Sequence, residues 1–323
     1  MKITILNADP NPAATPLNAL LEELSARLLA QHHQVNLISL RMLKLTPCTG
    51  CFGCWVKKPG ECLSADDSCE ICRSVIQADF VLWAAPIQMG FPNALLKLAL
   101  DKSIPLIHPY FAVDQGEAHH RPRYPHYPLL GMLLQPETDT DPTDLEIIQA
   151  VFSRTAINMK SHLLFCHSLP ISAESIVKEI TFAQTYQPTR SSPHLEALAG
   201  QTITPPHHIT ALNGSPRGLK GGTLLMLKKF LDGFSSKPGN EYELITLRRS
   251  DPIALSQAFA NAECLWLGFP LYTDSMPSIV KEWIETLRPF IGRPNNPPLG
   301  FLVQCGFPES LHIRYIERYL QKL

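Results

Sequence analysis

Short apolar strands alternate with amphipathic helices along this chain, and the alternation is what most constrains its fold. The segment "KITILN" at 2–7 is typical of a buried parallel strand, and "PLNALLEELSARLLAQ" at 16–31 carries apolar residues at helical spacing. Further strands are expected at "VNLISL", "ADFVLWAAP", "LLGMLLQ" and "HLLFCHS", with a helix near 143–158 before the last. Five strands with helices between them predict a doubly wound parallel α/β sheet.

The pattern recurs in the second half of the chain. "HHITALNGSP" repeats "MKITILNADP", "FPLYTDSMPSIVK" aligns without a gap with "APIQMGFPNALLK", and "PLGFLVQ" matches "LLGMLLQ". Three matches in one order indicate two copies of a domain. We therefore expect two tandem sheets of flavodoxin-like strand order, at 1–167 and 207–323, joined by an irregular linker at 168–206.

The second copy ends in a helix, "YIERYLQKL", with no counterpart to the fifth strand of the first copy. We therefore expect its sheet to lack the last strand and to leave an open edge. Either another chain covers that edge, or the natural chain extends beyond Leu323.

Composition narrows the class of protein. The 323 residues suffice for two domains with separate cores, and a net charge of −1 gives no reason to expect a nucleic-acid partner. Because the chain shows neither a signal-like N-terminus nor an apolar run of membrane-spanning length, we expect a cytoplasmic protein with reduced thiols. Nine cysteines, six of them between 48 and 72, then indicate metal or redox chemistry rather than a disulfide framework.

The loop after the first strand of the second copy, "NGSPRGLKGGT" at 213–223, is suited to an anion. It opens a helix, whose amides and dipole favour a phosphate, and it supplies two hydroxyls, a cation and four glycines that let backbone amides approach a ligand: Ser215, Thr223, Arg217, Gly214, Gly218, Gly221 and Gly222. The alternative is a glycine-rich turn that caps the helix, with Arg217 in solvent. Its position directly after the strand favours the phosphate.

The corresponding loop of the first copy, "NADPNPAATP", is poorer on the same criteria. Asp9 places a negative charge where a phosphate would lie, three prolines remove amide donors, and no glycine is present. We therefore expect the second copy to bind the phosphate and the first copy not to.

Two further loops of the second copy complete a pocket. "FPLYTDSMPS" presents an aromatic ring, hydroxyls and amides, and "QCGFPES" adds another wall. A phosphate site beside a flat slot suits flavin mononucleotide (FMN) better than a dinucleotide. Tyr272 either faces the ligand or packs on the following helix, and for Met276 we expect packing.

Together these residues resemble the NADPH-dependent FMN reductase family, and the run C-x2-C-x2-C-x7-C resembles the cysteine motif of iron–sulfur flavoproteins. The resemblance implies an FMN reductase-like oxidoreductase that takes electrons from NAD(P)H or a ferredoxin-type donor and passes them to a small-molecule or protein acceptor. It also implies a [4Fe-4S] cluster on Cys48, Cys51, Cys54 and Cys62. The cofactor-binding residues it indicates are Ser215, Arg217, Gly222, Thr223, Pro270, Leu271, Tyr272, Thr273, Ser275 and Gly306.

Chemistry at the cysteines leaves alternatives open. Short spacings with one distant ligand are usual for clusters, whereas all-cysteine zinc sites draw two pairs from separate hairpins. Thiols that bind nothing are a third interpretation, and Cys69 and Cys72 leave open which four cysteines are ligands. Cys166, Cys264 and Cys305 are expected to be packing residues.

The copies differ in complementary ways. The first has 22 more residues between its matched asparagine and proline (Asn7 to Pro86, against Asn213 to Pro270), close to the length of the cysteine segment. Members of this family generally form dimers with each flavin near the interface. The fused copies could therefore imitate a dimer, the first contributing a cluster and the second a flavin that faces it.

A His- and Pro-rich stretch near 108–127 is the other insertion, 15 residues longer than its counterpart and containing His119 and Arg121. A proline-stiffened surface loop is favoured over a lid on a redox site. No side chain of the chain stands out as a general acid or nucleophile. The non-enzymatic alternative is an electron carrier or a zinc-stabilised scaffold, and a homodimer is compatible with either.

Overall fold

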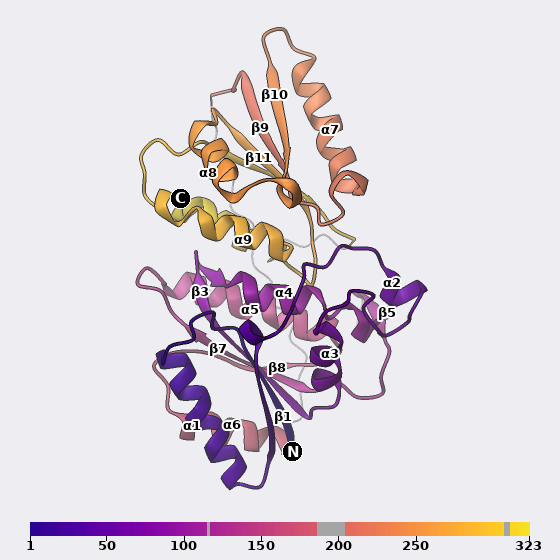
Figure 1. Cartoon of the computed structure of the whole chain (residues 1–323), viewed down its shortest axis with the longest axis vertical. Helices are drawn as coiled ribbons and strands as arrows, with labels where there is room; N and C mark the ends of the chain where they lie inside the picture. Colours follow the sequence, from indigo (N-terminus) through magenta and orange to yellow (C-terminus); the bar gives the residue numbers. More distant parts are fainter. Residues whose placement is uncertain (115–116, 186–203, 307–310) are drawn as a thin grey trace.

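The computed structural model describes residues 1–114, 117–185, 204–306 and 311–323. Two sheet domains lie one above the other along the longest axis, the first below the second (Figure 1). In this described part of the chain, no helix is both long and apolar enough to cross a membrane.

The first domain has the expected strand order. Its parallel sheet runs β2-β1-β3-β7-β8, formed by Gln34–Ser39, Lys2–Asn7, Phe80–Gln88, Leu129–Gln135 and Leu163–Ser168, and the two-residue strand β4 (Phe91–Pro92) pairs antiparallel with β3. One face packs against α1 (Pro16–Ala30) and α6 (Ala173–Phe182). The other face packs against α3, α4 and α5, which span Ser68–Ile76, Ala94–Asp101 and Pro142–Asn158.

The second domain repeats this arrangement with four strands. The order is β10-β9-β11-β12, formed by Glu241–Thr246, His208–Asn213, Leu265–Pro270 and Leu299–Gln304. Its helices are α7, α8, α9 and α10, which span Gly222–Ser235, Pro252–Asn261, Ser278–Thr286 and Leu311–Lys322. Among the described residues no fifth strand follows β12, as the sequence predicts.

Remaining elements are short. They are α2 (Gly53–Val56), the hairpin strands β5 (Ile107–Asp114) and β6 (Glu117–Pro122), and 3-10 turns at Leu40–Met42, Ile104–Leu106, Ala183–Thr185, Gly218–Lys220, Leu247–Arg249 and Arg288–Phe290.

Two expectations are corrected here. The segment 168–206 does not begin as an irregular linker, because α6 lies within it and buries Ile176, Val177 and Ile180 against α1. An amphipathic helix of ten residues has its apolar stripe covered in this way. The stretch near 108–127 is not a simple surface loop, because it contains the antiparallel hairpin β5–β6, whose His119 is 1% exposed.

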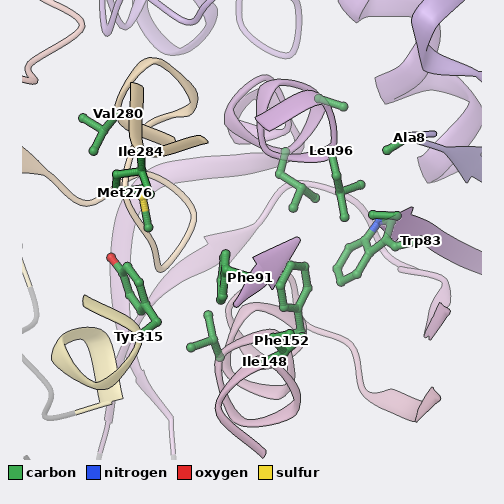
Figure 2. Close-up of a cluster of buried hydrophobic side chains, with 14 of the residues drawn as sticks. Ala8, Trp83, Phe91, Leu96, Ile148, Phe152, Met276, Val280, Ile284 and Tyr315 are labelled. Carbon is green, nitrogen blue, oxygen red and sulfur yellow. The ribbon is translucent and has the colours of Figure 1, made fainter. Parts of the chain in front are cut away.

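The domains meet through helices. Helix α4 packs on α9 and α5 on α10, and one apolar core continues across the boundary. Figure 2 shows Met276 and Tyr315 of the second domain opposite Phe91 of the first, with the rings of Phe91 and Tyr315 5.3 Å apart. Met276, 1% exposed, is a packing residue as expected. A shared core of this kind fixes the two domains relative to each other.

The charged contacts at this interface occur in two sets, at positions that the internal repeat aligns. Lys97 pairs with Asp101 on α4, and the aligned Lys281 pairs with Glu285 on α9. The carboxylate of Asp101 accepts the backbone N–H of Ser278 at 2.7 Å. Glu285 in turn accepts the N–H of Ala94 at 2.6 Å, the residue that aligns with Ser278. Asp101 thus contacts Ser278, and the residue aligned with Asp101 (Glu285) contacts the residue aligned with Ser278 (Ala94). Such reciprocal contacts are the signature of a two-fold interface.

Candidate cofactor site between the domains

The predicted anion loop of the second domain, residues 213–223, leads into a helix that has no side-chain cap. The side chain of Asn213 accepts the Ser215 N–H at 3.2 Å and donates to the Gly218 carbonyl at 3.2 Å, which folds the loop back on β9. Helix α7 then starts after Gly221 without any side-chain cap. Its first amides therefore remain available to an anion, with the hydroxyl-bearing Ser215 buried beside Gly221.

The equivalent loop of the first domain already holds an anion of its own. Asn7 makes the same turn and accepts the N–H of Asp9, which therefore occupies the place of Ser215. The Asp9 carboxylate accepts hydrogen bonds from Asn11 N–H at 2.9 Å and Thr15 Oγ1 at 2.5 Å. Thr15 also caps α1. A carboxylate thus lies at the position that corresponds to Ser215 of the second domain.

The cysteine segment of the first domain (residues 48–62) lies against the anion loop of the second (residues 213–223). A Cβ atom placed on Gly50 would lie 2.1 Å from Oη of Tyr272 and 3.0 Å from Cγ of Arg217. Gly50 has φ +60°, a conformation that glycine adopts without strain. Only hydrogen at this position permits the approach, so the chain's two unusual motifs are neighbours in space.

A cavity of about 360 Å³ opens beside this contact. Its first-domain walls come from the cysteine segment, the β5–β6 hairpin and the end of α5, and its second-domain walls come from the loops after β11 and β12: Phe52, Trp55, Ile107, Phe111, His119, His120, Arg154, Asn158, Leu271, Tyr272, Thr273, Asp274, Cys305 and Gly306 are among the lining residues. Volume and apolar lining match a small-molecule site.

An aromatic wall faces the second domain across this cavity. Phe52 stacks on Trp55 with centroids 5.2 Å apart, and Trp55 lies 5.2 Å from the ring of His120, which in turn contacts Phe111. The indole N–H of Trp55 donates to the carbonyls of Ile104 and Ile107 at 3.1 and 3.0 Å. These bonds attach the cysteine segment to the base of the hairpin.

A polar chain crosses from the hairpin to the second domain. Nδ1 of His119 lies 2.6 Å from Oδ1 of Asn158, whose Nδ2 donates to Asp274 at 2.6 Å. Because the amide N–H is used toward Asp274, the amide oxygen is the acceptor and His119 donates through Nδ1. Nε2 of His119 lies 3.1 Å from a Glu117 carboxylate oxygen.

Asp274 belongs to a tight turn with left-handed backbone. Thr273 has φ 47° and Asp274 φ 59°, while Tyr272 and Ser275 exchange backbone hydrogen bonds at 2.8 and 3.2 Å. A β-branched residue in this region is strained, and such strain concentrates at ligand sites. Burial, together with the nearby Cys48 and Asp101 charges, raises the pKa of Tyr272, so its phenol stays protonated.

The four cysteines of the motif surround a small hollow. Cys48, Cys51, Cys54 and Cys62 line it with Lys102 and Tyr272, and its volume of about 30 Å³ holds a water molecule or two. Four cysteine thiolates are the ligand set of a [4Fe-4S] cluster. Burial raises the pKa of Cys48 to about 11, and burial together with neighbouring thiols raises that of Cys54 to about 11.

The sulfur atoms are provided with amide donors. Gly53 N–H lies 3.4 Å from Sγ of Cys51, Ser64 N–H lies 3.5 Å from Sγ of Cys62, and a backbone bond from Gly50 favours the Cys48 thiolate. Three of the four sulfurs thus accept from the residue two positions further on. Such donors stabilise thiolate over thiol, and thiolate is the form that binds metal.

Zinc and cluster place different demands on these thiols. Within the described ranges no three His, Cys, Asp or Glu side chains converge to hold a single metal ion, whereas tetrahedral zinc needs four ligands around one atom. In a cluster each thiolate binds a different iron and the sulfurs stand further apart. Cys69 and Cys72 share one face of α3 but bond elsewhere, to the carbonyls of Cys62 and Lys102 at 3.7 and 3.2 Å.

Four of the ten predicted cofactor-binding residues line the cavity, and the others lie outside its lining. Leu271, Tyr272, Thr273 and Gly306 line the cavity, while Ser215, Gly222 and Thr223 belong to the anion loop and the start of α7. Arg217 approaches Gly50. Pro270 ends β11 and Ser275 closes the turn, so both support the wall rather than form it.

Sequence reasoning missed part of the site. Phe52, Trp55, Asn158 and Asp274 were not singled out, and Cys305 lines the cavity although we expected it to be a packing residue. Cys264 is a packing residue, 1% exposed. The length difference that marks the hairpin insertion was the available signal, but it does not reveal which domain the hairpin faces.

Comparison with known proteins shows what the first domain is similar to. Residues 1–120 match the model of the NADPH-dependent FMN reductase family. An iron–sulfur flavoprotein of Methanocaldococcus jannaschii is 32% identical over 106 residues, which is 33% of this chain and 53% of that protein. The chain thus spans about half the length of the curated relative it matches.

Solved structures with a similar layout include two reductases. An NAD(P)H:quinone oxidoreductase from Methanothermobacter marburgensis is 16% identical with a TM-score of 0.37, covering 57% of this chain and 96% of that chain. An FMN-dependent NADH-azoreductase from Bacillus anthracis, solved in complex with FMN, is 12% identical with a TM-score of 0.36, covering 57% and 97%.

Proposed function

We propose that the protein is an NAD(P)H-dependent FMN oxidoreductase whose two domains divide the cofactors between them. FMN binds to the second domain, with its phosphate at Ser215, Arg217 and the first amides of α7. Its ring occupies the cavity beside Leu271–Asp274. A [4Fe-4S] cluster binds to Cys48, Cys51, Cys54 and Cys62 of the first domain.

The observation that carries this proposal is the contact of Gly50 with Arg217 and Tyr272. It brings the cysteine segment to the wall of the ring cavity, since Tyr272 lines both the cavity and the cysteine hollow. Electrons could pass between thiolate-bound iron and flavin over a short distance within one chain. The carboxylate of Asp9 in the first domain's loop supports the choice of the second loop.

The protein's own contribution would be placement and electrostatics. A bound flavin supplies hydride and single-electron chemistry. Asn158 and Asp274 hold the wall of the ring slot, the aromatic wall at Trp55 and His120 excludes water from it, and the uncapped start of α7 fixes the phosphate.

A visible spectrum of protein purified without oxygen tests the proposal. We expect flavin bands that bleach with NAD(P)H, above a broad absorbance that is lost in a Cys48→Ser/Cys54→Ser variant while the flavin bands remain. Conversely, a Ser215→Ala/Arg217→Ala variant should lose flavin and keep the broad absorbance. A colourless protein that copurifies with zinc would overturn the proposal and favour the zinc-stabilised scaffold.

A further inference from the structure

A buried lysine lines the cysteine hollow. Lys102 follows α4 as its C-terminal cap and is 1% exposed. Lysine is rarely buried unless it is paired, because an isolated ammonium loses several kcal/mol of hydration in the interior. Its contacts therefore have to explain why it lies there.

The ammonium of Lys102 has four acceptors. It donates to Asp66 Oδ2 at 2.9 Å and to Ser64 Oγ at 2.9 Å, and it lies 3.5 Å from Thr46 Oγ1 and 3.7 Å from Sγ of Cys62. Two strong oxygen partners leave one N–H for the weaker pair. Of the last two acceptors, sulfur gains most when it is an anion.

Asp66 does not depend on Lys102 for its hydrogen bonds. Its carboxylate also accepts from Thr46 N–H at 3.1 Å and from Ser68 Oγ at 2.6 Å. These donors outweigh the effect of burial and hold its pKa well below the ordinary value. Asp66 thus acts as a fixed anion that keeps Lys102 charged, and the remaining direction of the ammonium is toward Cys62.

Other residues of helix α4 fix the position of Lys102. Lys97 and Asp101 on the same helix bond to Tyr272 and Ser278 of the second domain, so α4 is fixed at the domain interface. The backbone carbonyl of Lys102 also accepts from Sγ of Cys72 at 3.2 Å. The cation therefore keeps a constant distance from the cysteine segment, as an element that sets a redox potential must.

We propose that Lys102, positioned by Asp66, is the residue that sets the reduction potential of the cluster, through its charge and its N–H···S bond to Cys62. The inference rests on the proposed cluster at Cys48–Cys62. Net charge and hydrogen bonds to sulfur are the protein's main controls over iron–sulfur potentials. A cation near a thiolate favours the reduced, more negative form, so Lys102 raises the potential.

The test measures midpoint potential rather than turnover. Wild-type protein and variants are reconstituted with ferrous iron and sulfide, their iron content is determined, and the reduced signal is titrated by electron paramagnetic resonance. We expect Lys102→Met/Asp66→Asn to load iron and to shift the one-electron reduction equilibrium at least tenfold toward the oxidised form, about 59 mV more negative. Asp66→Asn alone, which leaves the ammonium uncompensated, should shift it in the opposite direction.

Two further variants separate the explanations. Lys102→Arg keeps the charge and should keep a potential closer to wild type than the double variant does. If the double variant does not fold, the opposite shift expected for Asp66→Asn still tests the role of the charge. Lys281→Met/Glu285→Gln removes another buried ion pair, away from the cysteines, and should leave the potential unchanged.

Unchanged potentials in both the Asp66→Asn and the Lys102→Met/Asp66→Asn protein, each with full iron content, would overturn the role of Lys102 while the cluster stands. Wild-type protein that takes up no iron would overturn the cluster, and this inference with it.

Discussion

Lys97 and Lys281 make the same contact in opposite directions across the domain interface. Nζ of Lys97 lies 2.7 Å from the carbonyl oxygen of Tyr272, and Nζ of Lys281 lies 2.6 Å from the carbonyl oxygen of Gln88. Tyr272 and Gln88 are themselves aligned by the internal repeat. One chain thus reproduces the reciprocal contacts of a two-fold dimer, but with unequal halves, since one anion loop is filled by Asp9 and the other is open.

This reciprocity predicts matched costs for two substitutions. Lys97→Met leaves Asp101 buried and unpaired, and Lys281→Met does the same to Glu285, so each should lower the free energy of unfolding by about 3–5 kcal/mol. Chemical denaturation measures both. Converting the partner as well, in Lys281→Met/Glu285→Gln, should recover most of the loss. A cost below 1 kcal/mol for either lysine would contradict the account of the interface.

The close approach of Gly50 predicts a stability effect with a matched control. Gly50→Ala should cost about 2–5 kcal/mol, because the methyl group meets Tyr272 in addition to the left-handed backbone strain. Gly60 has φ +92° and no atom nearer than 3.6 Å to an added Cβ. Gly60→Ala should therefore cost only the strain, about 1–2 kcal/mol.

A double variant locates the Gly50 contact. Tyr272→Phe removes the atom that lies 2.1 Å from the added methyl group, so Gly50→Ala should cost less in that background. Equal costs in the two backgrounds, measured by thermal unfolding, would place Gly50 away from Tyr272.

The open anion loop predicts phosphate-dependent binding. Ser215→Ala should weaken FMN binding about 10- to 100-fold, because a hydrogen bond to a charged group is worth about 1.5–3 kcal/mol, and it should leave riboflavin binding nearly unchanged. Fluorescence titration of apoprotein with each flavin measures this. Asp9→Asn, in the first domain's loop, is the control and should change neither affinity. Equal losses for FMN and riboflavin would argue against a phosphate at Ser215.

Acid should weaken the contact between α5 and α10. Burial opposes ionisation of Asp141, but backbone amides at the start of α5 and the Arg318 guanidinium lower its pKa below the ordinary 3.8. A lowered folded-state pKa gives stability that is complete above the unfolded value and is lost as pH falls through the folded value. The free energy of unfolding should therefore drop below pH 4, and drop less in Asp141→Asn. The same pH slope in both proteins would contradict this.

Sequence pattern was sufficient for much of this fold. Strand periodicity and the repeats gave both sheets, the order of the first, and the missing strand of the second, because buried parallel strands are continuous apolar runs. Helix α6 was missed because its apolar face is explained by the sheet and by α1, which lies over 140 residues earlier in the chain. Pattern alone cannot tell such a helix from part of a linker.

The parts of the site that depend on local chemistry could be predicted from the sequence. The parts that depend on how the two domains dock could not. The effects of Asp9 and of the glycines around Ser215 could be predicted from the sequence, since these residues directly change the charge or the amide access of their own anion loop. Asn158 and Asp274 have no local signature, because their bond exists only once α5 meets the second domain. The hairpin's place in the cavity wall depends on docking in the same way.

A crystal structure of the protein grown with FMN tests the central claim most directly. We predict the phosphate of FMN within hydrogen-bond distance of the Ser215 hydroxyl and the amides of Gly222 and Thr223, with its ring against Leu271–Asp274 and the cysteine segment alongside. FMN bound instead at the Asp9 loop of the first domain, with the second loop empty, would contradict the division of the two sites between the domains.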